Sequence, residues 1–183
     1  RMCRETRDWL ATLGDSIVIG DGGDIVATAA KILPVPREGA WMDPGPLGTL
    51  GVGMPFALAA QIAHPKKRVV IMYGDGSFGL NGFEYDTAVR FGLPIIGVMG
   101  NDAAWGQMMR PQGAVYGWDR LAATELTYTR YDKVVEALGG HGEYCERPEE
   151  IRPALDRAAA SGKPALVNIK IRQDKEYKGG IYV

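Results

Sequence analysis

The sequence predicts an α/β fold in which a mostly parallel, six-stranded sheet is covered by helices on both faces. Two observations support this class. Short apolar segments that are typical of buried strands alternate with helix-like segments along the 183 residues, and their connections are short. One segment, residues 94–99, is almost continuously apolar, as expected of a parallel strand that is covered on both sides. A chain of this length can bury a sizeable core.

Glycine and proline divide the chain into these elements, because both residues commonly end helices. We expect helices at 1–13, 25–33, 55–63, 81–91, 131–138 and 147–160. We expect strands at 16–19, 38–42, 68–73, 94–99, 142–145 and 164–171. The segment 102–127 shows no clear periodicity, so we expect an irregular loop there. A loop of that length inside a compact domain is usually functional.

Composition argues against two classes of function. The net charge of −1 gives no basic surface for nucleic acid and no polybasic patch for a membrane. No segment is apolar over the roughly 20 residues that cross a bilayer. Cys3 and Cys145 lack the spacing of metal ligands, so we expect packing roles in a reducing, cytoplasmic compartment. His64 and His141 have no carboxylate partner at catalytic spacing, and we expect both at the surface.

Two acidic segments follow neighbouring strands of the expected sheet. Gly74-Asp75-Gly76-Ser77 follows the strand at 68–73, and Asp102 follows the strand at 94–99. Ligands of an α/β sheet bind at the carboxyl ends of its strands, so both acids are expected at that edge. Two carboxylates suit a divalent cation such as Mg²⁺, and amides exposed by glycines with positive φ suit a diphosphate. The pattern predicts a Mg²⁺–diphosphate site.

A simpler interpretation of these residues stays open. Asp75 can merely cap a helix and Asp102 can occupy an ordinary turn, since Gly-Asp-Gly turns are common. An earlier segment, Gly20-Asp21-Gly22-Gly23-Asp24, follows the strand at 16–19 and is a weaker copy of the later pattern.

Three motifs in this order resemble those of thiamine diphosphate-dependent enzymes. The segments 74–77 and 100–102 resemble that family's fingerprint, which opens with Gly-Asp-Gly and closes with paired Asn. Residues 101–106 and the glycine-rich segment 48–53 look closest to the benzaldehyde lyase, 2-hydroxyacyl-CoA lyase, oxalyl-CoA decarboxylase and acetolactate synthase group. The resemblance covers nearly the whole chain. It implies the thiamine diphosphate-binding fold and the C-terminal, diphosphate-binding domain of such an enzyme.

The resemblance also implies roles for particular residues. Mg²⁺ would be bound by the side chains of Asp75 and Asp102 and by the backbone carbonyl of Ala104. Leu50 would wedge beneath the cofactor and hold it in a bent conformation, with ordinary core packing as the alternative. The Gly48 carbonyl would accept a hydrogen bond from the pyrimidine amino group. The remaining expected cofactor contacts are Gly22, Gly23, Gly74, Gly76, Ser77 and Trp105.

One position departs from the family pattern. The family usually has Asn where this chain has Asp102, and the Asn is retained one place earlier, at Asn101. Alignment through the preceding helix places Asp102 on the metal, while a shift of one residue would place Asn101 there. A second carboxylate would bind Mg²⁺ more tightly and weaken the local attraction for a diphosphate. Asn101 stays the reserve ligand.

The resemblance implies a partner. In the family, the glutamate that activates the cofactor lies on an N-terminal domain of a neighbouring subunit, and no motif for that domain occurs here. We therefore expect an N-terminal pyrimidine-binding domain or subunit, within a homodimer or tetramer of the full enzyme. The first residue is not Met, so we expect a fragment or a processed piece.

The activity implied is that of a carbon–carbon lyase, ligase or decarboxylase. We place 2-hydroxyacyl-CoA cleavage or formation first, and acetolactate synthase or benzaldehyde lyase chemistry next. Gln107 is expected to hydrogen-bond the substrate, which would be an acyl-CoA, an aldehyde or a ketone. We assign residues 1–171 to the diphosphate- and Mg-binding domain and 172–183 to a tail that is a candidate active-site lid. Candidate contacts for CoA phosphates are Arg110, Arg172, Lys175 and Lys178.

Two other classes stay open. One is a catalytically silent domain that keeps the cofactor and serves assembly or regulation, although retention of both acids and the glycine turns argues against it. The other is a Rossmann nucleotide-binding domain. That class is disfavoured because Gly20-Asp21-Gly22-Gly23 does not have the spacing Gly-x-Gly-x-x-Gly after the first strand.

Overall fold

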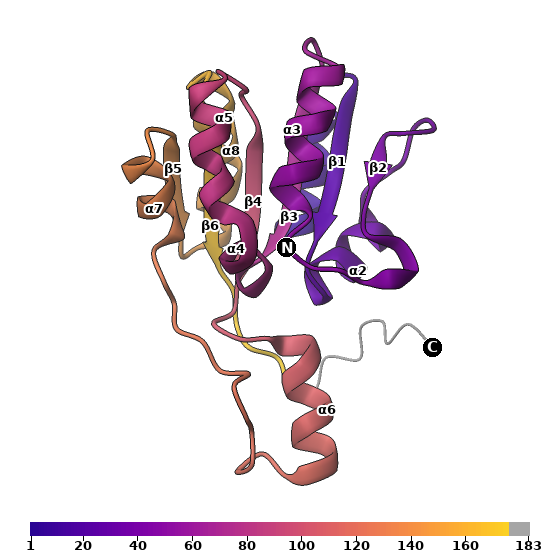
Figure 1. Cartoon of the computed structure of the whole chain (residues 1–183), viewed down its shortest axis with the longest axis vertical. Coiled ribbons are helices and arrows are strands. Elements are labelled where there is room, and N and C mark those ends of the chain that lie inside the picture. Colours follow the sequence, from indigo (N-terminus) through magenta and orange to yellow (C-terminus); the bar gives the residue numbers. More distant parts are fainter. Residues whose placement is uncertain (176–183) are drawn as a thin grey trace.

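The computed structural model describes residues 1–175 and contains one six-stranded sheet whose strands all run parallel (Figure 1). The strand order is β2-β1-β3-β4-β6-β5. The strands are β1 (Ser16–Asp21), β2 (Trp41–Met42), β3 (Arg68–Gly74), β4 (Ile96–Asn101), β5 (His141–Cys145) and β6 (Ala165–Lys170). The expected α/β class and the six strands are confirmed.

Helices cover both faces of this sheet. The α-helices are α1 (Met2–Leu10), α2 (Asp24–Ile32), α3 (Gly53–Ala63), α4 (Asp75–Asn81), α5 (Tyr85–Arg90), α6 (Gly106–Tyr116), α7 (Tyr131–Ala137) and α8 (Pro148–Ala160). Two 3₁₀ turns, η1 (Gly45–Leu47) and η2 (Gly82–Glu84), complete the set for the described residues. No helix among them is long and apolar enough to cross a bilayer.

The alternation of side chains along the strands separates two cores. On β3, Val70 and Met72 face one core with α1, α2 and α8, whereas Val69 and Ile71 face the other with α3, α4, α5 and α7. All four of these side chains are fully buried, which explains why the strand reads as a continuous apolar run. Cys3 and Cys145 lie unpaired in the first core, as expected of packing residues.

The strand order creates one crevice at the carboxyl edge. The chain leaves β1 for β2 on one side, then returns across β1 to β3, so connections from β1 and β3 diverge. Helix α2, which follows β1, packs in the first core, and α4, which follows β3, packs in the second. Ligands bind at such a switch point because the diverging connections leave a gap above the sheet.

Two helices differ from expectation. Helix α4 begins at Asp75 rather than near residue 81, so the Gly-Asp-Gly segment enters a helix directly. The segment 102–127, expected to be irregular, contains α6. Its buried residues are Gly106, Met109 and Gly113, and this stripe escapes detection by hydrophobic periodicity because two of the three are glycines. Figure 1 shows α6 standing beyond the carboxyl edge of the sheet.

The interpretation of His141 was wrong in one respect. Its Nε2 atom lies 2.8 Å from Oε1 of Glu143, so it does have a carboxylate partner. That carboxylate also accepts two hydrogen bonds from Arg157. His141 starts β5, and therefore lies at the amino edge of the parallel sheet, opposite the crevice.

Candidate functional site

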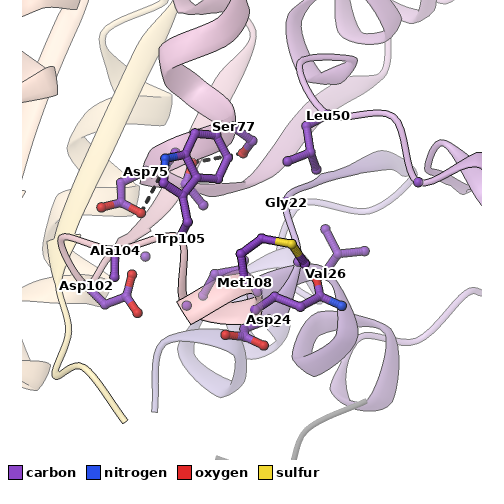
Figure 2. A pocket seen from close by; sticks show the side chains of 18 of the residues that line it. Gly22, Asp24, Val26, Leu50, Asp75, Ser77, Asp102, Ala104, Trp105 and Met108 are labelled. Carbon is purple, nitrogen blue, oxygen red and sulfur yellow. Dashed lines mark hydrogen bonds between the residues drawn. The ribbon is translucent and has the colours of Figure 1, made fainter. Parts of the chain in front are cut away.

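A cavity of about 740 Å³ opens at the carboxyl edge, at the crevice between β1 and β3 (Figure 2). Glycine-rich backbone from the ends of β1, β3 and β4 forms much of its wall. The site residues from the sequence analysis that line it are Gly22, Gly23, Gly48, Leu50, Gly74, Asp75, Gly76, Ser77, Asp102, Ala104, Trp105 and Gln107. The reserve ligand Asn101 and the candidate CoA contacts Arg110, Arg172 and Lys175 do not line it. The fold thus brings together residues from four separate parts of the chain.

Asp75 is the most unusual side chain of this cavity. It is 2 % exposed; Oδ1 accepts a hydrogen bond from the Gly76 amide at 3.0 Å, and Oδ2 is buried with no hydrogen-bond partner among the described residues. Burial, and next the negative charge of Asp102, raise the pKa of the Asp75 carboxyl group to about 7. A buried carboxylate oxygen without a donor costs free energy unless a cation or a proton meets it.

The carboxyl groups of Asp102 and Asp75 both lie close to the backbone of Ala104. Burial, and then the charge of Asp24, raise the pKa of Asp102 to about 6, while Arg110 lowers it. The Ala104 amide lowers the pKa of both Asp75 and Asp102, so both carboxyl groups lie close to it. Figure 2 shows the two acids on one side of the cavity, with Ala104 between them. Within residues 1–175 no group of three or more acidic, His or Cys side chains could hold a metal, so a metal bound by these two carboxylates would need ligands of other kinds as well.

Gly76 and Gly22 are needed because other segments pack closely against them, whereas a Cβ on Gly74 would make only ordinary contacts. Positive φ was expected at Gly74 and Gly76, but the expectation was wrong for both. The Trp105 ring lies against Gly76 instead, and a Cβ there would come within 2.7 Å of that ring. Gly22 does have a positive φ of +141°, and a Cβ on it would lie 3.0 Å from the Gly74 amide nitrogen. Close packing between segments therefore requires Gly76 and Gly22.

Ser77 joins the ends of β1 and β3. Its hydroxyl lies within hydrogen-bonding distance of two backbone carbonyls, 2.7 Å from that of Asp21 and 2.9 Å from that of Gly74. A hydroxyl has one proton, so its donor capacity is taken up inside the protein. Towards a ligand in the cavity, Ser77 can offer its oxygen as an acceptor or its backbone amide.

Leu50 enters the cavity from the opposite wall, as Figure 2 shows. The turn before it is exposed over residues 45–49, and Gly48 has the left-handed φ of +60°. Few neighbours therefore pack around this turn. On the same side of the cavity as Asp24, the Met108 side chain from α6 projects into the space.

Gln107 packs against the first acidic segment. A Cβ on Gly23 would lie only 2.0 Å from its Oε1 atom, so the absence of a side chain at Gly23 lets α6 approach the start of α2. In the same region Arg110 forms an ion pair with Asp24. Asp24 lines the cavity and was missed as a site residue, although its place two residues after Gly22 is a usable signal.

Asn101 does not line the cavity. Its side chain is fully buried and bonds to the Thr129 carbonyl at 3.1 Å, to Asn168 Oδ1 at 3.2 Å and to the Ala103 amide at 3.2 Å. Asn168 in turn donates to Asp132 at 3.0 Å. The carboxamide of Asn101 is therefore committed to the protein interior, while Asp102 faces the cavity.

Residues 172–175 lie beside the α6 segment. Gln173 donates to the Ala103 carbonyl at 3.1 Å, and Arg110 donates to the Asp174 carbonyl at 3.5 Å. The Lys175 ammonium is 5.0 Å from the centre of the Trp118 ring. The rest of the proposed lid, 176–183, including Lys178, lies outside the described residues.

A comparison with known protein families agrees with this fold and with the glycine-lined, acidic cavity. The family model described as "Thiamine pyrophosphate enzyme, C-terminal TPP binding domain" matches residues 21–169. The chain belongs to this family, thiamine pyrophosphate (TPP) being another name for thiamine diphosphate. The resemblance drawn from the motifs is confirmed.

Individual members of the family are similar to most of this chain. A probable acetolactate synthase of Mycobacterium bovis is 46 % identical over 155 residues, which cover 85 % of this chain and 28 % of that protein. The 2-hydroxyacyl-CoA lyase 2 of Caenorhabditis elegans is 43 % identical over 175 residues, covering 92 % of this chain and 27 % of the relative. The human 2-hydroxyacyl-CoA lyase 2 is 39 % identical over 178 residues, covering 94 % and 28 %. The chain thus spans less than a third of the length of the relatives it matches.

Proposed function

We propose that this chain is the Mg²⁺- and diphosphate-binding part of a thiamine diphosphate-dependent enzyme that cleaves or forms carbon–carbon bonds, with 2-hydroxyacyl-CoA as the first candidate substrate. The single observation that carries the metal proposal is the buried, unpartnered Oδ2 of Asp75 beside a second carboxylate, Asp102. Two partly buried like charges repel each other, and a divalent cation removes that repulsion. Mg²⁺ prefers oxygen ligands, and both side chains supply them.

The cavity also fits a diphosphate. Its wall at the ends of β1 and β3 consists of glycine backbone, which a phosphate can approach closely. The proposed contacts there are Gly22, Gly23, Gly74, Gly76 and Ser77. Mg²⁺ commonly bridges protein carboxylates and phosphate oxygens, so the acids need not repel the diphosphate. The Ala104 carbonyl is the proposed third protein ligand.

Asp102, rather than Asn101, is the proposed metal ligand. Support comes from the buried bonds of the Asn101 carboxamide to Thr129, Asn168 and Ala103, which it would have to break in order to reach the cavity. Breaking such bonds without replacement leaves buried polar groups unpaired. Asn101 is instead proposed to hold the turn that follows Asp102.

The cofactor, when bound, supplies a centre that stabilises the negative charge formed when a carbon–carbon bond is made or broken. The protein's contribution is positioning. Leu50 is proposed to support the bent cofactor, Gly48 to accept a hydrogen bond through its carbonyl, and Trp105 to close the cofactor side of the cavity. Gln107 is proposed to orient the substrate.

Metal titration tests the ligand assignment. In the full-length protein we expect Asp75→Ala and Asp102→Ala each to weaken Mg²⁺ binding by about 10-fold or more, as measured by calorimetry in the presence of thiamine diphosphate. Asp86→Ala is the matched control, since this acid is exposed and paired with Arg90 on α5. A loss confined to Asn101→Ala would show that the register is wrong.

The length of the relatives supports a partner. We propose that an N-terminal pyrimidine-binding domain or subunit supplies the activating glutamate, within a homodimer or tetramer. The unpaired, buried Cys3 and Cys145 fit the reducing, cytoplasmic compartment that we propose. Co-purification and sizing of the full-length protein, with and without cofactor, would test the assembly.

The choice of substrate has two candidates. The worm and human 2-hydroxyacyl-CoA lyases match more of the chain, 92–94 % against 85 %, whereas the acetolactate synthase has the highest identity of these three relatives. Parallel assays of the full-length protein for 2-hydroxyacyl-CoA cleavage and for acetolactate formation would separate them. Activity in neither assay, despite tight cofactor binding, would favour a catalytically silent domain.

The tail is proposed to close over a bound acyl-CoA, with Arg110, Arg172 and Lys175 near its phosphates. Deleting residues 176–183 keeps the described contacts of Gln173 and Asp174, so it isolates the outer tail. We expect this deletion to raise KM for an acyl-CoA and to leave KM for a small aldehyde unchanged. An unchanged KM for the acyl-CoA would refute the lid.

A further inference from the structure

The carboxylate of Asp21 is buried at the end of β1 without lining the cavity. It is 1 % exposed, and both of its oxygens are bonded to backbone amides of a distant segment. Oδ1 accepts from Gly51 at 2.9 Å and Oδ2 accepts from Gly53 at 2.7 Å. Burial raises the pKa of Asp21, and these two amides lower it. Among the described residues, the hydrogen bonds of the Asp21 carboxylate go to this one short segment, which points to a role in holding it in place.

The same segment is held from the other side by Asn81. Its Nδ2 atom donates to the Gly51 carbonyl at 2.6 Å. The Gly51 amide belongs to the peptide group that joins it to Leu50, and its carbonyl belongs to the next peptide group. Asp21 and Asn81 therefore fix the two consecutive peptide planes that follow Leu50.

We call Asp21 and Asn81, with the segment 51–53 that they hold, the clamp. Both of its glycines are necessary. Gly51 has the left-handed φ of +82°, and a Cβ on it would lie 2.9 Å from Asn81 Nδ2. A Cβ on Gly53 would lie 2.8 Å from Asp21 Oδ2. The Gly-x-Gly spacing after Leu50 thus exists to admit the two polar side chains.

The clamp also reaches the opposite wall of the cavity. Asn81 ends α4, whose first turn contains Asp75 and Ser77, and the Ser77 hydroxyl lies 2.7 Å from the Asp21 carbonyl. Asp21 thus contacts the Leu50 segment through its side chain and the start of α4 through its backbone. The turn at 45–49 is exposed and gives Leu50 little support of its own.

We infer that Asp21 and Asn81 are positioning residues that set the place of Leu50 in the cavity and tie it to the acidic end of α4. This inference rests on the proposed function, because Leu50 matters catalytically only if a cofactor bends over it. The first acidic segment is then no second metal turn: its carboxylate positions the residue on which the cofactor rests.

Hydrogen exchange of the full-length protein without cofactor tests the clamp itself. We expect Asp21→Asn and Asn81→Ala to speed exchange in the peptide covering residues 48–54 by about 10-fold or more, because each removes a hydrogen bond that holds Gly51 or Gly53. Asp15→Asn is the matched control: it precedes β1 at the opposite edge and its side chain is 50 % exposed. Exchange equal to that of the control in both variants would overturn the clamp. Asn81 is exposed, so its variant keeps the test valid if Asp21→Asn fails to fold.

A double-mutant cycle tests whether the clamp acts through Leu50. We expect Asn81→Ala and Asp21→Asn to lower kcat by about 10- to 100-fold, with KM for thiamine diphosphate changed much less. Combined with Leu50→Ala, neither should lower kcat further, because the residue that they position is already gone. Additive losses would show that the two residues act independently of Leu50 and would overturn the inference.

The hydrogen-exchange and kinetic experiments together separate this inference from the proposed function. If the unmodified protein shows no thiamine diphosphate-dependent activity, the proposed function fails, and the catalytic role of the clamp fails with it. Faster exchange in the variants would then still show that Asp21 and Asn81 hold the segment. Normal exchange together with cofactor-dependent activity would overturn the clamp alone.

Discussion

The ends of β1 and β3 carry similar sequences and use them in opposite ways. After β1, both oxygens of Asp21 are bonded to backbone amides. After β3, one oxygen of Asp75 is bonded to a neighbouring amide, and the other is buried and has no hydrogen-bond partner within residues 1–175. The first acid is satisfied inside the protein, whereas the second is left for something that binds. A glycine-flanked aspartate therefore indicates a ligand site only when its own fold leaves it unsatisfied.

The largest expected difference between the two acids is in catalysis. If Asp75 binds Mg²⁺ as proposed, Asp75→Asn in the full-length protein should lower thiamine diphosphate-dependent activity by about 100-fold or more, because the variant weakens that ligand. Steady-state kinetics across a Mg²⁺ series would measure this loss. High Mg²⁺ should recover part of it, while no Mg²⁺ concentration should rescue Asp21→Asn. Equal responses of both variants to Mg²⁺ would abolish the contrast.

For the stability of the metal-free protein we expect the reverse order, with Asp21→Asn more harmful than Asp75→Asn. Asp21→Asn replaces an acceptor with an amide donor that faces the Gly51 or Gly53 amide, so we expect a loss of about 1–3 kcal/mol in the free energy of unfolding. Asp75→Asn should be neutral or stabilising, since it removes a buried charge beside Asp102. Urea denaturation of the metal-free protein would compare them. A larger loss for Asp75→Asn would contradict this account of the two acids.

The pH dependence of stability gives a finer test. The folded pKa of Asp75, about 7, lies above the ordinary value of 3.8, so the folded protein binds more protons than the unfolded chain between these values. Its stabilising contribution is complete below about pH 4 and is lost as the pH rises through about 7. The metal-free protein should therefore lose up to about 1.4 kcal/mol per pH unit from this group.

Thermal unfolding at several pH values, with Asp75→Asn alongside, would isolate that contribution. The variant should show a flatter dependence between pH 5 and pH 7, a range inside the shift given above. Asp102, with its pKa of about 6, adds a smaller slope of the same sign. Saturating Mg²⁺ should reverse the trend, because the metal binds the ionised carboxylates. Identical slopes for the variant and the unmodified protein would refute the raised pKa of Asp75.

The smallest expected effect is at Ala103, next to Asp102. Its φ of 56° is left-handed, a conformation that costs a non-glycine residue about 1 kcal/mol. Ala103→Gly should relieve this cost but add freedom to the unfolded chain, so a net gain of less than about 1 kcal/mol is expected. Chemical denaturation would measure it. A clear destabilisation would mean that the Ala103 methyl group contributes packing that outweighs the backbone cost.

The sheet could be predicted from the sequence because each strand and its turn are local patterns. The meeting of Asp75, Asp102 and the glycine segments at one edge follows from parallel topology alone. Their roles as ligands stay predictions. The helix α6 could not be predicted, because its buried stripe contains Gly106 and Gly113 and it includes Pro111.

The reasons for individual residues depended on contacts between distant segments. Gly76 is required by the Trp105 ring, and Asp21 bonds to amides thirty and thirty-two residues later. No local pattern indicates either contact. The same holds for Asn101, whose bond to Asn168 joins two strands and separates it from the neighbouring Asp102. Sequence patterns located the acids but could not tell which of them were already satisfied.

The two ends of the segment that carries α6 lie close together, just beyond the carboxyl end of β4. The Leu126 amide donates to the Ala103 carbonyl, and the Trp105 amide donates to the Thr124 carbonyl, both at 2.8 Å. An excursion whose two ends are joined in this way can change in length and sequence at little cost to the rest of the domain. Gln107 and Met108 line the cavity from inside this segment, so a change in the segment would alter that wall of the cavity as a unit. Gly74-Asp75-Gly76-Ser77 and Asp102 lie outside the segment, so the two acids would keep their place in the sheet while that wall changes.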